Sequence, residues 1–265
     1  MIADYHLHTS FSFDSTEQME NICEKAIEAG IEEVCFTDHV EFTTENENKW
    51  PDFLVRNNKI EECREKYGKQ LSVLNGIEVG QPHRELQQQK QLLTDFEFDF
   101  IIASVHVITN IGSPSKYSFT KGNCIDFVDH YFDDLKKVAK QSDFDVLGHM
   151  TFPFRYVPQE LLEIYPIHSF KREFMEIFEI IVERGKGIEI NTSGLRTVLK
   201  ETIPNQQVVK WYKECGGKII TVGSDGHSSK SAFSGLEIGY QILKNAGFEE
   251  IARYKKRHLS FEKLL

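Results

Sequence analysis

The chain has 265 residues, of which 40% are hydrophobic and 27% charged, and its formal net charge is −10 at pH 7. This length can bury a large core and fits one barrel-sized domain, and the composition is ordinary for a soluble globular protein. The acidic balance argues against non-specific nucleic-acid binding, because that binding depends on Lys and Arg side chains that contact phosphates.

Short apolar runs alternate along the chain with amphipathic segments. The runs predict strands over residues 2–8, 32–39, 71–80, 98–106, 144–150, 187–194 and 218–227. The amphipathic segments predict helices over residues 16–30, 55–68, 85–96, 124–141, 169–185 and 205–217. This alternation favours a parallel sheet covered by helices, and seven strands favour an α/β barrel over an open sheet. Because no linker or low-complexity segment interrupts the pattern, a single domain over residues 1–265 is expected.

The first predicted strand ends in His6 and His8. Residues i and i+2 of a strand point to the same face, so both imidazoles leave the strand from one side. Two imidazoles on one face can bind one ion of zinc, manganese or iron. A His-x-His pair alone is weak evidence, because such pairs also occur by chance on protein surfaces.

Polar or metal-binding residues also end the later predicted strands. These strand ends carry Asp38 and His39, Glu78, Ser104 and His106, His149, Glu189 and Asn191, and Asp225 and His227. In a barrel of parallel strands, the C-terminal ends converge on one face, where active sites are built. With His6 and His8 of the first strand, six of the ten histidines fall at strand ends, a placement that uniform scatter would rarely produce.

These strand ends, together with an acidic residue in the loop after the first strand, predict a metal centre. The predicted ligands are His6, His8, Asp14, His39, Glu78, His106, His149, Asp225 and His227. Nine ligands are too many for one tetrahedral zinc ion and suit two or three ions that share bridging carboxylates. Such sites hold phosphoryl oxygens and lower the pKa of a bridging water, so the pattern predicts a metal-dependent hydrolase. Any one histidine alone could be an ordinary core residue.

The runs HLHTSFSFD, FTDH, GIE, SVH, GHM and SDGH, in this order from His6 to His227, resemble the motifs of the polymerase-and-histidinol-phosphatase (PHP) family. The resemblance implies a distorted (β/α)7 barrel of the TIM type with three divalent metal ions (zinc, manganese or iron) at the C-terminal ends of its strands. It implies one subsite of His6, His8, Glu78 and Asp225, a second of Glu78, His106 and His149, and a third of Asp14, His39 and His227. Many family members have His where this chain has Asp14, which leaves the metal of the third subsite open.

The stretch GIEINTSGLR, residues 187–196, resembles a signature of the family branch that hydrolyses histidinol phosphate, and the chain length fits that branch. The resemblance implies a phosphomonoesterase of histidine biosynthesis that acts on L-histidinol phosphate. We expect a hydroxide that bridges two metal ions to attack phosphorus directly. Other members act on nucleotides, sugar phosphates, phosphotyrosine or nucleic-acid ends, so another small phosphate ester is the alternative substrate.

Two arginines are predicted to bind the phosphate, because Arg suits bidentate contacts with phosphoryl oxygens. Arg155 follows His149, and Arg196 follows the sixth predicted strand. Either could also be a solvated loop residue. For the proton that the leaving alkoxide needs, the candidates are Asp225, His227 and His83.

Further substrate contacts are predicted at His83, Glu41, Phe42 and Ser104. Glu41 and Phe42 begin an acidic and aromatic loop after the second predicted strand, which also contains Glu45. Carboxylates and aromatic rings in such a loop suit the amine and imidazole of the substrate. For each loop residue, plain surface filling is the simpler interpretation, and the acidic run itself could be a solvated segment.

Two other classes of protein fit the pattern less well. A degenerate barrel that serves as a binding module would lack ligands, whereas all nine positions hold competent groups. A metal-dependent amide hydrolase would leave the two arginines without a role. The five scattered cysteines form no C-x-x-C pair, which predicts free thiols and a cytoplasmic protein, and no signal peptide or membrane span is expected. The expected partner is a small phosphate ester, with no nucleic acid and no membrane, and the oligomeric state is not indicated.

Overall fold

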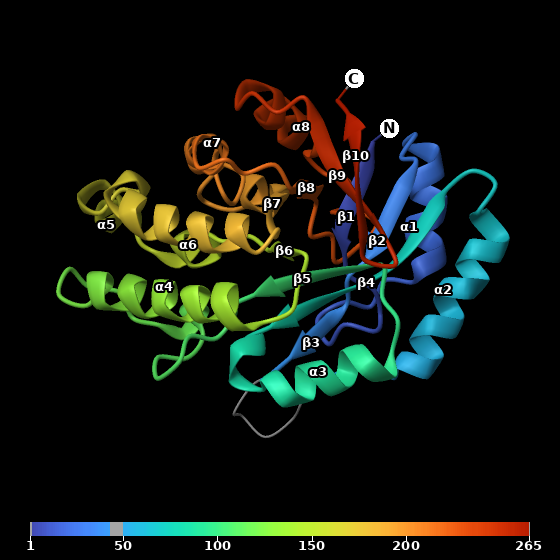
Figure 1. Ribbon diagram of the computed structural model, residues 1–265, viewed down its shortest axis with the longest axis horizontal. Helices are drawn as coiled ribbons and strands as arrows, with labels where there is room; N and C mark the ends of the chain where they lie inside the picture. The colour runs from blue at the N-terminus through green and yellow to red at the C-terminus, as the bar shows by residue number, and fades with distance from the viewer. Residues whose placement is uncertain (1, 43–49, 265) are drawn as a thin grey trace.

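A parallel sheet, curled into a nearly closed barrel, forms the centre of the computed structural model, which describes residues 2–42 and 50–264 (Figure 1). Its path runs through β1 (Ala3–Leu7), β2 (Glu33–Phe36), β4 (Ser72–Gly80), β5 (Phe100–Ser104), β6 (Val146–Leu147), β7 (Gly187–Asn191) and β8 (Ile220–Gly223). The barrel closes where β1 meets the segment after β8. There His8 N donates to Gly226 O at 2.9 Å, and Asp225 N donates to His6 O at 2.8 Å. All seven predicted strands are present in the predicted order.

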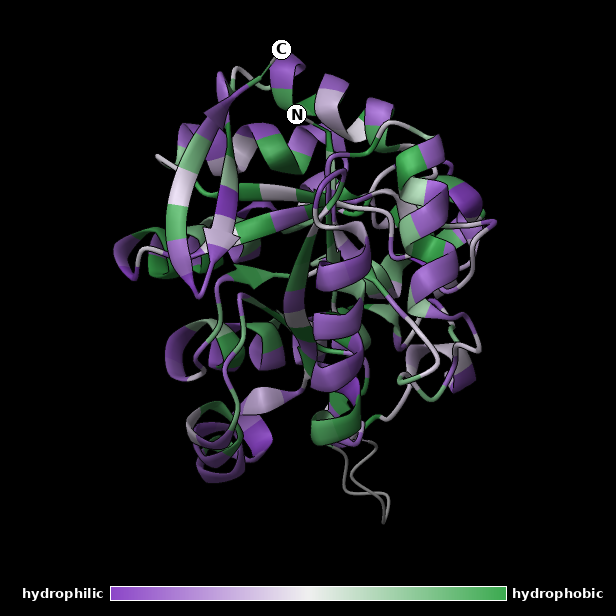
Figure 2. Cartoon of the chain, turned by 90° about the vertical axis from the view of Figure 1, so that its right-hand side faces the viewer, coloured by the Kyte–Doolittle hydropathy of each residue, from purple (hydrophilic) through white to green (hydrophobic). Residues whose placement is uncertain are grey.

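Helices cover the outside of the barrel. The six predicted helices are α1 (Met19–Glu28), α2 (Phe53–Tyr67), α3 (Leu86–Asp95), α4 (Cys124–Gln141), α6 (Lys171–Glu183) and α7 (Gln206–Glu214). In α2 the buried residues recur every three or four positions, from Phe53 to Tyr67, which turns one face to the sheet. Figure 2 shows helices whose outward surfaces are largely hydrophilic around more hydrophobic strands. Two further helices were not predicted, α5 (Gln159–Ile164) and α8 (Leu236–Asn245).

The second predicted strand is divided in the structure. β2 ends at Phe36, and after two intervening residues a short strand, β3 (His39–Glu41), begins and pairs with β4. The prediction that His39 ends a strand is therefore wrong, because His39 begins one. The break lies at Asp38, whose carboxylate accepts a hydrogen bond from Thr9 N at 2.7 Å instead of facing water. β3 keeps the register that β2 has against β4, so His39 lies directly opposite Glu78.

A C-terminal hairpin that was not predicted covers the N-terminal end of the barrel. It consists of β9 (Glu250–Lys255) and β10 (His258–Lys263), joined by two residues with positive φ, Lys256 and Arg257. The ring of Tyr254 lies 5.1 Å from that of Phe100 inside the barrel. The two chain ends consequently lie near each other (Figures 1 and 2). In the described part of the chain, none of the helices combines the length and apolarity needed to cross a bilayer.

A buried arginine on α2, Arg56, connects the helix layer to the barrel through hydrogen bonds. Arg56 is 0% exposed, and its Nε donates to Asp38 Oδ2 at 2.7 Å. Its other nitrogens donate to Asn75 Oδ1 at 2.6 Å and to the carbonyls of Phe36 and Gly76 at 2.8 and 2.7 Å. Four of the five N–H groups of the guanidinium are thus bonded inside the protein, and the charge of Asp38 is compensated there.

Replacing Arg56 by Met should lower the free energy of unfolding by about 3–5 kcal/mol, because it leaves the Asp38 carboxylate buried without its partner. Urea denaturation monitored by circular dichroism measures this difference. The matched control is Arg172→Met, since Arg172 is 82% exposed and pairs with Glu173 at the surface. The control should change stability by less than about 0.5 kcal/mol. Equal losses in the two variants would contradict the structural role of Arg56.

Candidate metal centre

A pocket of about 480 Å³ opens at the C-terminal ends of the barrel strands. It is lined by Phe13, Asp14, His39, Glu41, Glu78, His106, Val107, Ser113, Ser115, Lys116, His149, Phe152, Arg155, Tyr156, Asp225 and His227. Most of the predicted ligands are therefore gathered at one cavity, although they come from strands far apart in the sequence. His6 and His8 lie fully buried against the inner side of this group.

Glu78 of β4 lies at the centre of the cluster. Its Oε1 is 2.7 Å from Nε2 of His149 and 3.1 Å from Nε2 of His106. The Nε2 atoms of these two histidines are 3.3 Å apart. Because β5 and β6 are neighbours in the sheet, the residues that follow them arrive side by side. The predicted second subsite of Glu78, His106 and His149 is thus brought together.

The second carboxylate oxygen of Glu78 faces three further imidazoles. Its Oε2 lies 3.3 Å from Nε2 of His6, 3.5 Å from Nε2 of His8 and 3.0 Å from Nδ1 of His39. At 3.0 Å the contact with His39 lacks hydrogen-bond geometry. Among the described residues, neither His39 Nδ1 nor Glu78 Oε2 has a hydrogen-bond partner. Both are buried polar atoms that a cation between the side chains would satisfy.

The end of β1 forms a second group with the segment after β8. The Nε2 atoms of His6 and His8 are 3.0 Å apart, and Oδ1 of Asp225 lies 3.8 and 3.4 Å from them. Asp225 has a positive φ of 54°, which turns its side chain back toward β1. The first predicted subsite therefore assembles across the closing seam of the barrel.

A third group lies at the mouth of the pocket. Oδ2 of Asp14 is 3.4 Å from Nε2 of His39 and 3.2 Å from Nε2 of His227. The ring of His8 stacks on His39 and on His227, with centroid distances of 4.2 and 4.1 Å. The residues of the third predicted subsite are thus also adjacent, and Asp14 reaches both of its histidines.

The donor set fits divalent cations. Four sets of three side chains have ligand atoms within 4.8 Å of one another, namely His6, His8 and Asp225; His6, Glu78 and His149; His8, His39 and His227; and His39, Glu41 and His106. Imidazole nitrogens and carboxylate oxygens are ligands for zinc, manganese and iron. The Nε2 atoms of His6 and His8 are 3.0 Å apart, close enough for both to bind one ion.

The pKa values of the imidazoles are shifted in opposite directions by burial and by neighbouring charges. Burial alone would lower the pKa of His106, but Glu41 and Glu78 outweigh burial and raise that pKa to about 10. For His8, burial and the neighbouring His39 lower the pKa to about 3. The protein without ions therefore holds a protonated His106 among carboxylates beside a neutral His8.

The carboxyl groups of the centre stay ionised. Burial opposes ionisation of Glu78 and Asp225, but the surrounding imidazoles outweigh it and hold the pKa of each well below its usual range. The pKa of Asp14 is also lowered, against the effect of burial, by hydrogen bonds from His227 and His39. At neutral pH the pocket thus offers several anionic oxygens, which favour cations.

Glu189 was predicted at a strand end, but its carboxylate was not predicted to lie behind the ligands and support them. Glu189 of β7 is fully buried, and its Oε1 lies 2.6 Å from Nδ1 of His6 while Oε2 accepts from His149 N at 2.9 Å. A proton on Nδ1 that faces a carboxylate leaves Nε2 of His6 free to bind a metal. The signal was present in the sequence, because Glu189 shares the inward face of its strand with Asn191.

The two predicted arginines differ in placement. Arg155 lines the pocket, where its guanidinium lies 4.1 Å above the ring of Phe152 and donates to Tyr156 Oη at 2.9 Å. Arg196 is exposed and does not line the pocket. Its Nη2 donates instead to the carbonyls of Ser224 and Asp225 at 2.7 and 3.2 Å, so it supports the segment that carries Asp225. Its predicted contact with phosphate stays a prediction.

Three other predicted substrate contacts are not brought to the pocket. Phe42 follows β3 on the face opposite to His39 and Glu41, so it packs in the core edge-on to Trp50. Ser104 is fully buried at the end of β5. The side chain of His83 is buried, with Nε2 3.4 Å from Oδ1 of Asp134 on α4.

Glu41 and Glu45, the other two residues predicted for this region, have separate outcomes. Glu41 lines the pocket, where its Oε1 lies 2.7 Å from Nδ1 of His106. Glu45 lies outside the described residues.

Aromatic and cationic side chains complete the pocket wall and were not predicted. Phe13 is 54% exposed, and its ring stacks on that of His39 at 5.1 Å with an interplanar angle of 26°. Phe152 and Tyr156 approach from the segment after β6. Lys116 lines the pocket from the loop between β5 and α4. Their positions depend on loop packing, for which the sequence carries no periodic signal.

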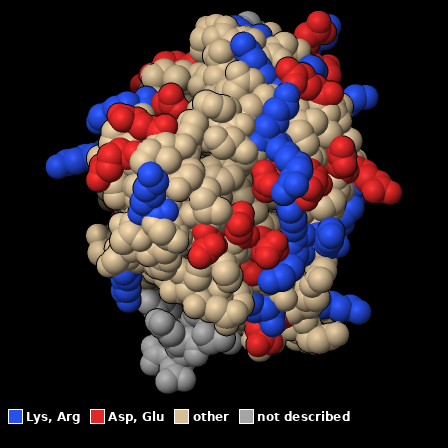
Figure 3. Space-filling view, turned by 90° about the vertical axis from the view of Figure 1, so that its left-hand side faces the viewer, with Lys and Arg blue, Asp and Glu red and all other residues tan. Residues whose placement is uncertain are grey.

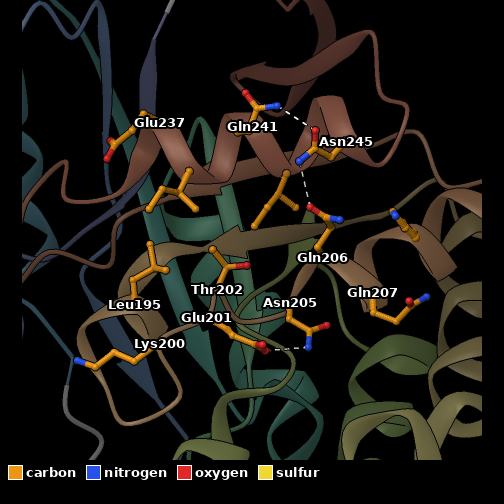
Figure 4. A pocket seen from close by; sticks show the side chains of 13 residues that line it. Leu195, Lys200, Glu201, Thr202, Asn205, Gln206, Gln207, Glu237, Gln241 and Asn245 are labelled. Carbon is orange, nitrogen blue, oxygen red and sulfur yellow. Dashed lines mark hydrogen bonds between the residues drawn. The ribbon is translucent and has the colours of Figure 1, made fainter.

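A larger groove of about 800 Å³ lies elsewhere, between α7, α8 and the segment after β7 (Figure 4). Amide side chains dominate it, with Gln241 bonded to Asn245 at 2.9 Å and Asn245 to Gln206 at 3.1 Å. Its lining contains no His or Cys. The smaller pocket, not this groove, therefore holds the metal-binding residues.

On the face that carries α4 and α6, acidic and basic side chains are interspersed (Figure 3).

Comparisons with known proteins agree with this arrangement. A family model described as PHP domain matches residues 4–193. The histidinol-phosphatase of Lactococcus lactis subsp. lactis (strain IL1403) is 28% identical over 273 residues, which cover 95% of this chain and 93% of the relative. A protein of Clostridium acetobutylicum named probable histidinol-phosphatase is 27% identical over 268 residues, which cover 98% of this chain and all of the relative.

A solved structure also shares the fold. The crystal structure of histidinol phosphate phosphatase from Lactococcus lactis, complexed with zinc, L-histidinol and phosphate, matches with a TM-score of 0.83 at 24% identity. The match covers 98% of both chains. The predicted barrel fold is thereby confirmed.

Proposed function

The chain belongs to the PHP domain family, and from this premise we propose that it hydrolyses L-histidinol phosphate to L-histidinol and phosphate. The observation that carries the proposal is the convergence of imidazoles and carboxylates around Glu78 in a pocket that also contains Arg155. Relatives named for this activity align over nearly their whole length, which supports the same substrate class. A pocket of about 480 Å³ suits a small ester.

We propose that the centre holds three divalent ions, drawn from zinc, manganese and iron. The residues that would hold them are the nine predicted ligands His6, His8, Asp14, His39, Glu78, His106, His149, Asp225 and His227. Ions held there would offset the charge of the phosphate and lower the pKa of the attacking water. Glu78 is the residue best placed to be shared between ions, because its two oxygens face separate groups of histidines.

The chain's own residues would bind and orient the ester. Arg155 is fixed by Phe152 and Tyr156 and can direct two N–H groups at phosphoryl oxygens. The exposed ring of Phe13 offers an aromatic surface at the mouth for the imidazole of the substrate. His227, whose Nδ1 lies 3.4 Å from Oδ1 of Asp225, is the proposed proton donor to the leaving oxygen.

Arg155→Met should lower kcat/KM for the ester by about 10–100-fold, because a hydrogen-bonded charge contact with the phosphate is worth about 1.5–3 kcal/mol. Steady-state phosphate release measures this loss. Arg172→Met is the control, since Arg172 lies on the outer surface. An Arg155 variant with unchanged kcat/KM would show that Arg155 does not bind the phosphate.

The substrate is tested by phosphate release from L-histidinol phosphate beside a panel of nucleotides and sugar phosphates. Metal-loaded protein and a chelator-stripped control are assayed in parallel. A strong, metal-dependent preference for L-histidinol phosphate supports the proposal. Metal-dependent release from another ester would overturn the substrate, and no release from any ester by metal-loaded protein would overturn the phosphatase activity.

We also propose that residues 1–265 act as one unit and that the protein is cytoplasmic. The sheet continues without interruption from β7 to β8, beyond the last residue that the family model matches. All five cysteines are free thiols, which suits a reducing compartment. Disulfide formation in freshly prepared protein would argue against that location.

A further inference from the structure

A strained residue follows β4 directly, next to the centre. Gln81 has φ 54° and ψ 43°, in the left-handed region that residues with a side chain seldom adopt. It is also fully buried. A strained, buried amide persists only where the surrounding structure fixes it, and such residues gather at functional sites.

All the side-chain contacts of Gln81 lead to the wall of the pocket. Its Oε1 accepts hydrogen bonds from His106 N at 2.5 Å and from Val107 N at 3.1 Å. Its Nε2 donates to Oε2 of Glu41 at 2.7 Å. One side chain thus joins β3, the end of β4 and the segment after β5.

Glu41 completes the connection to the ring of His106. Its Oε1 lies 2.7 Å from Nδ1 of His106, and the carboxylate is buried. His106 is therefore held at two points, its backbone N–H by Gln81 and its ring by Glu41. With Nδ1 engaged, Nε2 faces Glu78 at 3.1 Å and His149 at 3.3 Å.

The backbone beside Gln81 makes room for this arrangement. A Cβ added at Gly80 would overlap the carboxylate of Glu41. Only a glycine at this position lets the carboxylate lie against β4, within reach of both Gln81 and His106. The residue pair Gly80–Gln81 therefore builds the support for one ligand.

We propose that Gln81 is a positioning residue of the metal centre, which sets the orientation of His106 both directly and through Glu41. The proposal rests on the proposed function in so far as Glu78, His106 and His149 are taken to hold an ion. It predicts that loss of the Gln81 amide weakens ion binding at this group without removing any ligand. Supporting residues of this kind typically change metal affinity by about 10–100-fold.

The test compares Gln81→Met with Gln89→Met. Gln89 is an equally suitable control, because it is 2% exposed and bonds the backbone of Asp143 from α3, away from the pocket. Zinc is the probe, and its affinity and stoichiometry are measured by competition with a chromophoric chelator, beside the melting temperature. Gln81→Met should bind one zinc ion about 10–100-fold more weakly than wild type, whereas Gln89→Met should bind as wild type does.

A second variant separates backbone strain from hydrogen bonding. Asn tolerates the left-handed conformation better than most residues, but its side chain is one methylene shorter. Gln81→Asn should therefore fold with little change in melting temperature and still lose zinc affinity. Wild-type zinc binding by Gln81→Asn or by folded Gln81→Met would overturn the proposal, as would an equal loss in Gln89→Met.

The readout is independent of the substrate. If the wild-type protein binds zinc but releases no phosphate, the proposed function fails while the positioning role of Gln81 is still decided by the zinc titration. Absence of zinc, manganese and iron binding in the wild type would overturn both proposals together.

Discussion

Replacing Glu78 by Gln should lower kcat for phosphate release by at least about 10³-fold, equivalent to about 4 kcal/mol of transition-state stabilisation. The physical reason is that this carboxylate faces two groups of ligands at once. One oxygen approaches His149 and His106, and the other approaches His6. The amide of Gln is neutral, and its nitrogen cannot bind a metal ion beside imidazoles.

Single-turnover and steady-state phosphate release measure the loss in Glu78→Gln, with metal content determined on the same samples. Glu28→Gln is the control, because Glu28 is an exposed residue at the end of α1. Circular dichroism and the melting temperature show whether the variant is folded. Folded Glu78→Gln with more than a tenth of the wild-type kcat would remove Glu78 from the centre of the proposed site.

Stripping divalent ions with a chelator should lower phosphate release at least about 10³-fold, and adding back zinc, manganese or iron should restore it. Without ions the pocket presents the ionised carboxylates of Asp14, Glu78 and Asp225, whose pKa values are held low. These carboxylates then face protonated imidazoles such as that of His106, so the pocket keeps its charged groups but lacks the ions that would lower the pKa of the attacking water.

Removal of the divalent ions should be easier at pH 6 than at pH 8. The pKa of His106 is raised to about 10 in the ion-free protein, so protons compete with metal ions for this ligand, and the competition strengthens as pH falls. Mass spectrometry of metal content after dialysis at the two pH values measures the effect. Full turnover by protein shown to contain no metal would contradict the metal dependence altogether.

The candidate centre could be predicted from the sequence because its ligands follow a simple rule of barrels. His6, Glu78, His106 and His149 stand at or just after the ends of parallel strands, and those ends meet on one face whatever the details of packing. The apolar runs that mark the strands are local, so the strand order could be inferred without knowledge of any contact. The barrel and the gathering of these strand-end ligands both follow from this, whereas Asp14 lies in the loop after β1 and His39 begins β3.

The side-chain contacts around the ligands could not be predicted, because they depend on the direction in which each side chain points. The segment predicted as a loop after His39 continues as β3 in the register of β2, so Glu41 reaches His106 on the inner face while Phe42 enters the core on the other. Gln81 and Glu189 support ligands that lie 25 and 183 positions away along the chain. No periodicity in the sequence reports such partners, because they are fixed only when the strands are in register.

The seam of the barrel determines when the centre can exist during synthesis. Oδ1 of Asp4 accepts a hydrogen bond from Ser224 N, 220 positions later, at the same seam where His6 meets Asp225. During synthesis, His6 and His8 are therefore added to the chain long before Asp225, which completes their group. Contacts between such distant segments form late in folding. An ion bound across the seam would hold β1 and the segment after β8 together, so it would stabilise the barrel only once both segments have been synthesised.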